Sequence, residues 1–266
     1  MATRGKALMT GRRRVLPHVD IDTPNVSRVY DYLLGGALNF EADRAYAEKL
    51  VKIMPDLKLV MQENRDFLQR AVRFLLEAGI TQFLDLGSGL PVFDSTHQIA
   101  PDARVVYVDN DELTVTHSEI VLAGNPRATM VLADITKPDT ILNHPVTRGF
   151  LDFDQPIAVV VGAVMHFVHE NPVGVLGCYR DATAPGSYLV LSHLTGDNRP
   201  EVDYLHKHHP GDPTQLTYRD RGEVTELLTG YDLVAPGVVF TSQWRPDTEV
   251  ANPHRSGVYA AVGHLT

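Results

Sequence analysis

The chain has 266 residues, of which 44% are hydrophobic, and a formal net charge of −9. This length and composition suit one large α/β domain with elaborations and exclude a fibrous or disordered protein, while the acidic balance disfavours nucleic acid as the main partner. No apolar run approaches the roughly 18 residues that cross a bilayer, so no membrane contact is expected, and the single cysteine, Cys178, excludes an internal disulfide and suits a reducing cytoplasm.

The first 14 residues carry five positive charges and no negative charge, which leaves −14 for the rest of the chain. We predict a disordered basic tail over residues 1–20, with contact to an anionic surface as the alternative. The segment lacks the long apolar core and the small-residue cleavage pattern of a secretory signal, so a cytoplasmic protein is expected. The sequence leaves the oligomeric state open.

Three helices are predicted before residue 80. Residues 24–36 begin with a proline and end in a glycine pair, which is typical of a short helix with a glycine stop, and a second helix is expected over 41–53. From residue 57 apolar side chains recur at helical spacing until Gly79. We therefore predict an N-terminal helical extension over residues 21–80.

From residue 81 to residue 266 short apolar strands alternate with helical segments. Continuous apolar strands between helices imply a parallel sheet that is covered on both faces. The pattern predicts a single α/β domain with a doubly wound, mostly parallel, seven-stranded sheet. The expected strands are 82–86, 104–108, 129–133, 157–163, 187–193, 232–240 and 257–265, and the expected helices are 92–100, 111–123, 138–149, 171–183 and 220–228.

The turn after the first expected strand reads "LDLGSGLP". Gly87 and Gly89 let the backbone approach a ligand and lead the chain toward a helix N-terminus. A dinucleotide site needs a further small residue where this chain has Val92, and Asp85 would repel a pyrophosphate but attract an ammonium group. A nicotinamide-dependent oxidoreductase is therefore disfavoured. With Ser88 between its glycines, the segment resembles the first motif of S-adenosylmethionine-dependent methyltransferases, whose loop cradles the methionine part of the cofactor.

Acidic residues also follow the next two expected strands. Asp109 lies 20 residues beyond Gly89, where a carboxylate can accept both ribose hydroxyls, and Asn110 flanks it. In methyltransferases of this kind the end of the third strand holds adenine, so the resemblance assigns its amino group to Asp134 and packing on its ring to Ile135. One acid after a strand is more often a helix cap, but three at successive strand ends favour the cofactor.

The fourth expected strand is followed by "GAVMHFV". Methyltransferases that act on amino groups of DNA bases carry an Asn or Asp, two prolines and an aromatic residue here, so base methylation is disfavoured, and Val164 is expected beside the cofactor. His166 is a candidate general base because imidazole has a pKa of about 6.5, and His193 after the fifth strand is another; each could equally be a packed, hydrogen-bonded histidine. The cluster "HKHH" at 206–209 lacks the separated ligand pairs of zinc sites, so no metal is expected.

Residues 21–266 also resemble a bacterial family that is classed as S-adenosylmethionine-dependent methyltransferases, which implies the Rossmann-like class I fold. The most specific pieces are "RVYDYLLGG", "ENRDFLQRAVRF", "FLDLGSGLP", "VVYVDND", "MHFV", "PGSYLVLSH" and "GVYAAVG". By this resemblance Asn64 and Arg65 would approach the methionine end of the cofactor, where Arg65 could pair with the carboxylate. A surface ion pair and a satisfied helix asparagine are the alternative. The chain departs from the family at Ala37 and Leu38, where relatives usually carry Lys-Asp, and this change could alter what docks above the cofactor.

The same resemblance gives a role to "YDYLLGG". This segment would form a lid in which Tyr30 and Asp31 close over the cofactor, bending at Gly35 and Gly36. A plain helix stop is the alternative for the two glycines. Tyr30 could also line the acceptor pocket.

The sequence thus predicts a methyltransferase that binds S-adenosylmethionine over residues 81–266 and transfers its methyl group to a small molecule by direct displacement. That reaction needs no metal and little acid or base help. His166 or His193 would serve as base for a hydroxyl or a protonated amine, and residues 195–218 are expected at the acceptor pocket or its rim. The alternative is a non-catalytic regulator or partner subunit that binds S-adenosylmethionine without turnover.

Overall fold

The computed structural model of the protein describes residues 20–90, 95–202, 216–248 and 250–266. The predicted basic tail, apart from residue 20, and the histidine cluster at 206–209 lie outside these residues. None of the helices in the described part of the chain is long and apolar enough to cross a membrane. The same residues contain no group of three or more side chains placed to hold a metal ion.

The three predicted N-terminal helices are confirmed as α1 (Val26–Leu33), α2 (Glu41–Ile53) and α3 (Leu57–Glu77). Helix α1 begins where the side chain of Asn25 accepts a hydrogen bond from the backbone of Arg28. It ends just before Gly35, whose φ of +82° lies in the left-handed region that favours glycine. The division of the chain at residue 80 into an extension and a domain stays a prediction.

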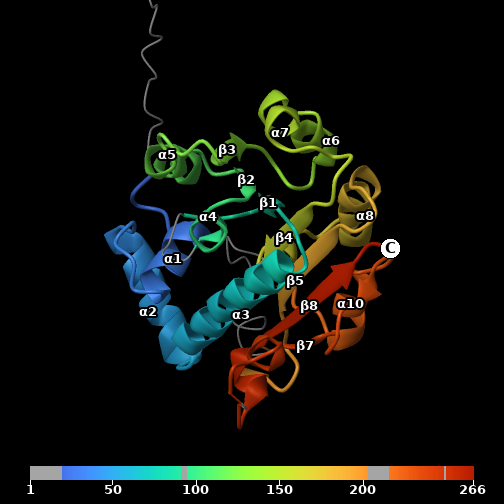
Figure 1. Ribbon diagram of the computed structural model, residues 1–266. Coiled ribbons are helices and arrows are strands. Elements are labelled where there is room, and N and C mark those ends of the chain that lie inside the picture. The colour runs from blue at the N-terminus through green and yellow to red at the C-terminus, as the bar shows by residue number, and fades with distance from the viewer. Residues whose placement is uncertain (1–19, 91–94, 203–215, 249) are drawn as a thin grey trace, which may run out of the picture.

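The strands form one sheet in the order β3-β2-β1-β4-β5-β8-β6, with β7 also paired to β8 (Figure 1). Strands β1 to β5 pair in parallel and the last three pair antiparallel. The order reverses between β1 and β4, and α/β sheets bind ligands beyond the carboxyl ends of the strands at such a point. The bounds are β1 (Gln82–Leu86), β2 (Arg104–Asp109), β3 (Ala128–Leu132), β4 (Ala158–Gly162), β5 (Tyr188–Leu194), β6 (Asp232–Leu233), β7 (Val239–Phe240) and β8 (Val258–His264).

The described residues form eight strands rather than the predicted seven, because the expected strand 232–240 divides into β6 and β7. Pro236 interrupts it, since proline has no N–H for a sheet hydrogen bond. Gly237, with a φ of +84°, donates back to the carbonyl of Val234 at 2.9 Å and closes a turn. The two halves then pair separately with β8.

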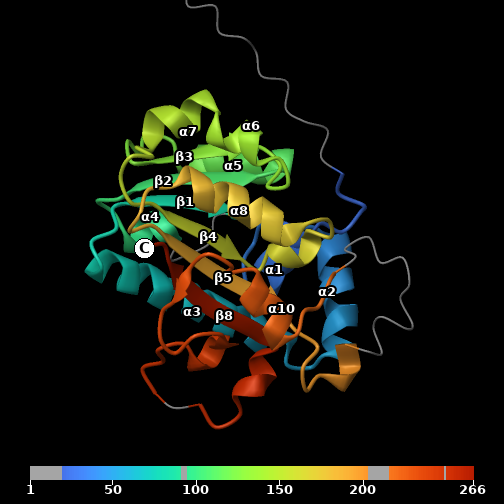
Figure 2. The same cartoon turned by 90° about the vertical axis from the view of Figure 1, so that its right-hand side faces the viewer.

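Helices cover both faces of the sheet. The predicted helix 138–149 is wrong as a single element and forms two, because Pro145 lacks the N–H that would continue the first. Figure 2 shows α8 and α10 across one face, and α3 lies on the opposite face in Figure 1. The helices that follow α3 are α4 (Thr96–Ile99), α5 (Glu112–Val121), α6 (Pro138–Leu142), α7 (Pro145–Phe150), α8 (Pro172–Ala182) and α10 (Arg221–Glu226).

Of the three apolar clusters among the described residues, two cover the sheet, one on each face, and the third packs α1, α2 and the start of α3 together. Leu84 and Leu86 of β1 belong to the cluster under α6, α8 and α10, whereas Phe83 belongs to the cluster under α3 and α5. This alternation is the period of two that a strand imposes on its side chains. It leaves Asp85 on the same face as Phe83, toward α3.

Candidate cofactor and active site

The turn after β1 requires both of its glycines. Gly87 and Gly89 have φ values of +66° and +67°, and the N–H groups of Gly87 and Ser88 donate to the carbonyl of Val108 at 2.8 and 3.1 Å. A Cβ on Gly87 would lie 2.3 Å from Cγ2 of Val164, so a side chain has no room there. A Cβ on Gly89 would meet only Ser27 Oγ, at 3.9 Å. The turn therefore presents bare backbone beside Val164, as predicted for a close ligand.

Asp109 holds this turn from the end of β2. Its Oδ2 accepts the N–H of Gly89 at 2.9 Å, and its Oδ1 accepts the N–H of Asp111 at 3.0 Å. The carboxyl group is buried, and this burial raises its pKa despite the two hydrogen bonds. Each carboxylate oxygen can accept a further hydrogen bond, so a ribose diol fits as an additional partner. Its predicted neighbour Asn110 is exposed.

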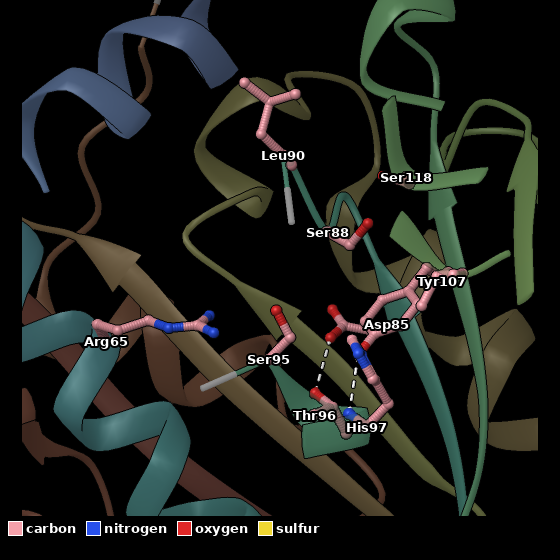
Figure 3. Close-up of a pocket in the computed structure, with 11 residues that line it drawn as sticks. Arg65, Asp85, Ser88, Leu90, Ser95, Thr96, His97, Tyr107 and Ser118 are labelled. Carbon is pink, nitrogen blue, oxygen red and sulfur yellow. Dashed lines mark hydrogen bonds between the residues drawn. The ribbon is translucent and has the colours of Figure 1, made fainter. Parts of the chain in front are cut away.

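Asp85 lies below the turn, on the side that faces α3. Its Oδ2 accepts a hydrogen bond from Thr96 Oγ1 at 3.0 Å, and burial raises its pKa to about 6 even though Thr96 and Arg65 act in the opposite direction. Figure 3 shows Arg65 extending from α3 toward Ser95 and Asp85. Arg65, Asp85, Ser88 and Gly89 line one small pocket, so the structure brings these four predicted residues together.

His97 and Tyr107 also line this pocket, and neither was predicted. The Tyr107 hydroxyl accepts the backbone N–H of His97 at 2.9 Å and lies 2.8 Å from its Nδ1. The hydroxyl can donate to Nδ1 or accept a second hydrogen bond from it, so this contact is compatible with either tautomer of the ring. Partial burial lowers the pKa of His97, which keeps the ring neutral. The one sequence signal was the helix expected over 92–100, described in the structure as α4 from Thr96, and it gives no indication of the partner on β2.

A larger cavity of about 460 Å³ adjoins the small pocket and shares three of its residues, Arg65, Ser95 and His97. The predicted lid contributes one wall. The remaining lining residues are Asp31, Leu34, Gly35, Gly36, Ala37, Leu38, Gln62, Gln69, Gln98 and Val121.

Asp31 shapes the turn of the lid. Its Oδ2 accepts hydrogen bonds from the backbone of Leu38 at 2.8 Å and from Asn39 Nδ2 at 2.9 Å. A Cβ on Gly36 would lie 2.0 Å from Asp31 Oδ1, so this glycine is needed for the close approach. The carboxylate thus holds the bend in place at the cavity wall, in addition to any contact with a ligand.

Tyr30 and Asn64 contact each other across α1 and α3. Asn64 Nδ2 donates to the Tyr30 hydroxyl at 3.1 Å, and that hydroxyl donates to the carbonyl of Met61 at 3.4 Å. Asn64 is 1% exposed, and its Oδ1 has no hydrogen-bond partner in the described part of the chain. Burial raises the pKa of Tyr30, so the hydroxyl stays protonated. Tyr30 therefore braces α1 on α3, beside an amide oxygen that is open to one further donor.

Helix α1 lies over the loops that follow β1 and β2. Asn25 Nδ2 donates to Asp111 Oδ1 at 3.3 Å, and Asp111 also caps α5 by accepting the N–H of Thr114 at 2.7 Å. Ser27 is the residue nearest to the vacant side-chain position of Gly89. Sequence reasoning missed both contacts, because they join residues more than 60 positions apart.

At the end of β3, Asp134 forms its own local turn. Its Oδ1 accepts from the backbone N–H of Thr136 at 2.9 Å and from the hydroxyl of Thr136 at 2.7 Å, and Lys137 lies 3.7 Å from its Oδ2. Burial raises the pKa of Asp134, but these hydrogen bonds and the lysine bring it below its ordinary value. Ile135 is buried in the core and accepts a hydrogen bond from the Tyr179 hydroxyl at 2.9 Å through its carbonyl. The predicted adenine contacts of both residues stay predictions.

His193 is a packed, hydrogen-bonded residue, which was the alternative to a general base. Its Nδ1 lies 2.7 Å from the carbonyl of Leu194 and its Nε2 lies 2.6 Å from Arg219 Nη1. Since a guanidinium can only donate, Nε2 accepts and Nδ1 carries the proton. Burial lowers the pKa of His193 to about 4, assisted by the charge of Arg219. With both nitrogens engaged, His193 is not available to take a proton from a substrate.

His166 lies in the short helix after β4 and is 3% exposed. Its Nδ1 has no hydrogen-bond partner among the described residues. Burial lowers the pKa of His166 well below its ordinary value, and His193 and Arg219 lower it further. The ring is neutral at pH 7 and is a weak base.

A family model described as S-adenosyl methyltransferase matches residues 13–266. The crystal structure of a candidate methyltransferase from Thermobifida fusca YX is 42% identical, covers 93% of this chain and 97% of that chain, and has a TM-score of 0.88. A DUF574 family protein from Streptomyces avermitilis MA-4680 is 35% identical, with 93% and 99% covered and a TM-score of 0.86. No curated protein matches the chain.

A more distant structure shares the fold. The magnesium protoporphyrin IX methyltransferase of Synechocystis PCC 6803, crystallised with S-adenosylhomocysteine, is 14% identical, with 90% of this chain and 93% of that chain covered and a TM-score of 0.55. The predicted Rossmann-like methyltransferase fold and the predicted cofactor are confirmed. The chain belongs to the S-adenosyl methyltransferase family and is an S-adenosylmethionine-dependent methyltransferase.

Proposed function

We propose that the protein transfers the methyl group of S-adenosylmethionine to a small-molecule acceptor at the carboxyl ends of β1 and β4. The observation that carries the small-molecule acceptor is the cover over this edge, where α1 contacts the loop after β2 through Asn25 and approaches the glycine turn through Ser27. A covered site excludes a bulky acceptor such as duplex nucleic acid, which the net charge of −9 also disfavours. The cavity of about 460 Å³ beneath the lid is of the size that small ligands occupy.

The residues present fit the cofactor at three points. Gly89 leaves space for a ligand against the turn, Asp109 keeps acceptor capacity for a ribose diol, and Asp85 offers a carboxyl group for an ammonium. We assign the methionine carboxylate to Arg65, which lines both cavities. The cofactor supplies a methyl group on a sulfonium, which leaves as a neutral thioether.

The protein's own part is binding, orientation and exclusion of water. The buried carboxylate of Asp109 fixes the turn through Gly89, and Val164 packs against Gly87 from the end of β4. This packing fixes the distance between the two strand ends where donor and acceptor meet, and such alignment is the main source of acceleration in a direct displacement. The lid keeps the site dry, which strengthens its electrostatic contacts.

Calorimetry with S-adenosylhomocysteine tests the cofactor site. We expect binding to the wild type, with the affinity reduced about 100-fold or more in Asp109→Ala, because the ribose and the turn lose the same carboxylate. Asp102→Ala is the matched control, since Asp102 is exposed and, within the described part of the chain, only its backbone carbonyl is hydrogen-bonded. Equal affinity of the two variants would show that the assignment of Asp109 is wrong.

Methyl transfer itself needs a separate experiment. The protein is incubated with methyl-labelled S-adenosylmethionine and a deproteinised metabolite extract, and the label is followed into small molecules. Label in a product, lost in Asp109→Ala, supports turnover on a small-molecule acceptor. Tight binding without any labelled product would contradict the proposal and indicate a cofactor-binding regulator.

A further inference from the structure

A buried arginine holds the end of β4 beside the predicted cofactor site. Arg219 is 7% exposed and donates through Nη1 to the carbonyl of Met165 at 3.0 Å and through Nη2 to the carbonyl of Val168 at 2.9 Å. Its third partner is the neutral ring of His193. Met165 directly follows Val164, the residue that packs against Gly87. The guanidinium therefore contacts the residue that directly follows Val164, the side chain that packs against the glycine turn.

The charge of Arg219 is not balanced locally. Its three partners are two carbonyls and an imidazole, and no ion pair joins it to a carboxylate within residues 20–90, 95–202, 216–248 and 250–266. Glu223 is the acid that influences it electrostatically, and its Oε2 instead accepts the backbone N–H of Asp220 at 2.8 Å. A buried cation without a counter-charge is costly, so an anionic ligand would be stabilised here.

Among the described residues of this region, neither histidine is an effective base. Both nitrogens of His193 are engaged, and His166, whose ring centroid is 5.6 Å from that of His193, is buried and neutral. An acceptor that must first lose a proton, such as an alcohol or a phenol, would find neither of these two histidines able to take it. An acceptor that is already ionised needs no base. A carboxylic acid with an ordinary pKa of about 4 is ionised at neutral pH, whereas a phenol with a pKa of about 10 is not.

From this cluster we infer that the methyl acceptor is a carboxylate, held beside Arg219 and the open nitrogen of His166, and that the product is a methyl ester. The inference rests on the function proposed above. A guanidinium has five donors in a planar fork that matches a carboxylate, and three of those of Arg219 are accounted for. In the reaction a carboxylate oxygen forms the new C–O bond as the C–S bond breaks, and the electron pair of that bond stays on sulfur. The carboxylate and the sulfonium both become neutral, and no proton moves.

The chemistry of the product tests this inference. Labelled small molecules are prepared with the wild-type protein, methyl-labelled S-adenosylmethionine and a deproteinised extract of Streptomyces avermitilis, the source of one relative, and are then treated with mild alkali. A methyl ester releases its label as volatile methanol, which is the expected result. Label that resists alkali, as an N-methyl or an ether does, would overturn the carboxylate acceptor and leave the proposed function intact. The absence of any labelled product would contradict the proposed function itself.

A variant series tests the role of Arg219. Arg219→Gln keeps a donor for one carbonyl but removes the charge, and we expect ester formation to fall about 30-fold or more while calorimetry gives an unchanged affinity for S-adenosylhomocysteine. Arg219→Lys keeps the charge but lacks the planar fork of donors, so its rate of ester formation should lie between those of the wild type and Arg219→Gln. The matched control is Arg70→Gln, because Arg70 also donates to two carbonyls, those of Thr241 and Trp244, away from the strand ends.

Equal ester formation by Arg219→Gln and the control would refute the role of Arg219. If Arg219→Gln does not unfold cooperatively, and is therefore not properly folded, ester formation by Arg219→Lys and the alkali treatment of the wild-type product still test the proposal.

Discussion

The backbone N–H of Gly89 donates to Asp109 Oδ2 at 2.9 Å, which ties the turn after β1 to the end of β2. The other oxygen of the same carboxylate accepts the N–H of Asp111. One buried acid thus orders the turn and is the proposed ribose ligand, so the turn is formed before the cofactor arrives.

Asp109→Asn separates these two roles. An amide has one acceptor oxygen, so its NH₂ group must face one of the two backbone N–H donors and leave it unsatisfied. We expect a loss of about 1–3 kcal/mol in the free energy of unfolding, measured in urea, together with weaker binding of S-adenosylhomocysteine. Unchanged stability would mean that the carboxylate is not needed to hold the turn.

Gly87→Ala should abolish cofactor binding because the new Cβ would lie 2.3 Å from Val164. Gly79→Ala is a matched control, since Gly79 has a comparable φ of +88° but nothing within 4 Å of the added Cβ. The control isolates the cost of the left-handed conformation, about 1 kcal/mol. A larger loss of stability in Gly87→Ala, measured by thermal unfolding, reports the clash. Equal losses would show that Val164 yields to the methyl group.

How much of this site could be predicted depends on the sequence separation of its parts. The glycine turn and Asp109 could be identified because each directly follows a strand and parallel neighbours bring their carboxyl ends together. The neutral, proton-on-Nδ1 state of His193 could not, because it depends on Arg219, 26 residues away. The Asn25–Asp111 hydrogen bond spans 86 residues for the same reason.

The misjudged elements have a local cause. The helix expected at 138–149 and the strand expected at 232–240 were drawn through Pro145 and Pro236, and proline removes the N–H that would have continued either element. The apolar pattern on both sides of each proline was strong enough to hide the interruption. The residues that direct the chemistry are thus brought together by tertiary contacts, whereas the elements follow from local patterns.

Asp85 makes stability depend on pH. Its pKa is raised from 3.8 to about 6 by burial, so in this interval the unfolded chain releases a proton that the folded chain retains. The contribution of Asp85 to the stability of the wild type should therefore fall as the pH rises from 3.8 to about 6. Asp85→Asn has no such group, so its stability relative to the wild type should increase through this interval, by on the order of 2 kcal/mol. Parallel pH profiles of the two proteins in urea unfolding would show that Asp85 titrates normally.

The same group couples cofactor binding to a proton. If the cofactor ammonium pairs with Asp85, binding favours the carboxylate and lowers its pKa. Binding of S-adenosylhomocysteine at pH 6 should then release a fraction of a proton, and the affinity should rise between pH 5 and pH 7, by about tenfold. Calorimetry in buffers of different ionisation enthalpy measures the released proton. No proton release in the wild type, or the same release in Asp85→Asn, would place the ammonium elsewhere.

The hydrogen bond between Asn25, at the start of α1, and Asp111 should control how fast the cofactor leaves. Asn25 has two roles, since its Oδ1 caps α1 at Arg28 and its Nδ2 reaches Asp111. Asn25→Ser preserves the cap, because serine is equally preferred at this position, but it is too short for the contact with Asp111. We expect stability close to that of the wild type and faster dissociation of S-adenosylhomocysteine, by about threefold to tenfold for one lost hydrogen bond.

Asn25→Ala loses the cap as well and should cost about 1 kcal/mol of stability in addition. Stopped-flow displacement of a fluorescent cofactor analogue measures dissociation, and urea unfolding measures the cap. Because the two variants differ in the cap and share the lost contact, they should dissociate alike and unfold differently. If Asn25→Ala dissociates faster than Asn25→Ser, in proportion to its lower stability, then α1 frays as a whole. In that case the hydrogen bond between Asn25 and Asp111 does not by itself hold α1 over the site.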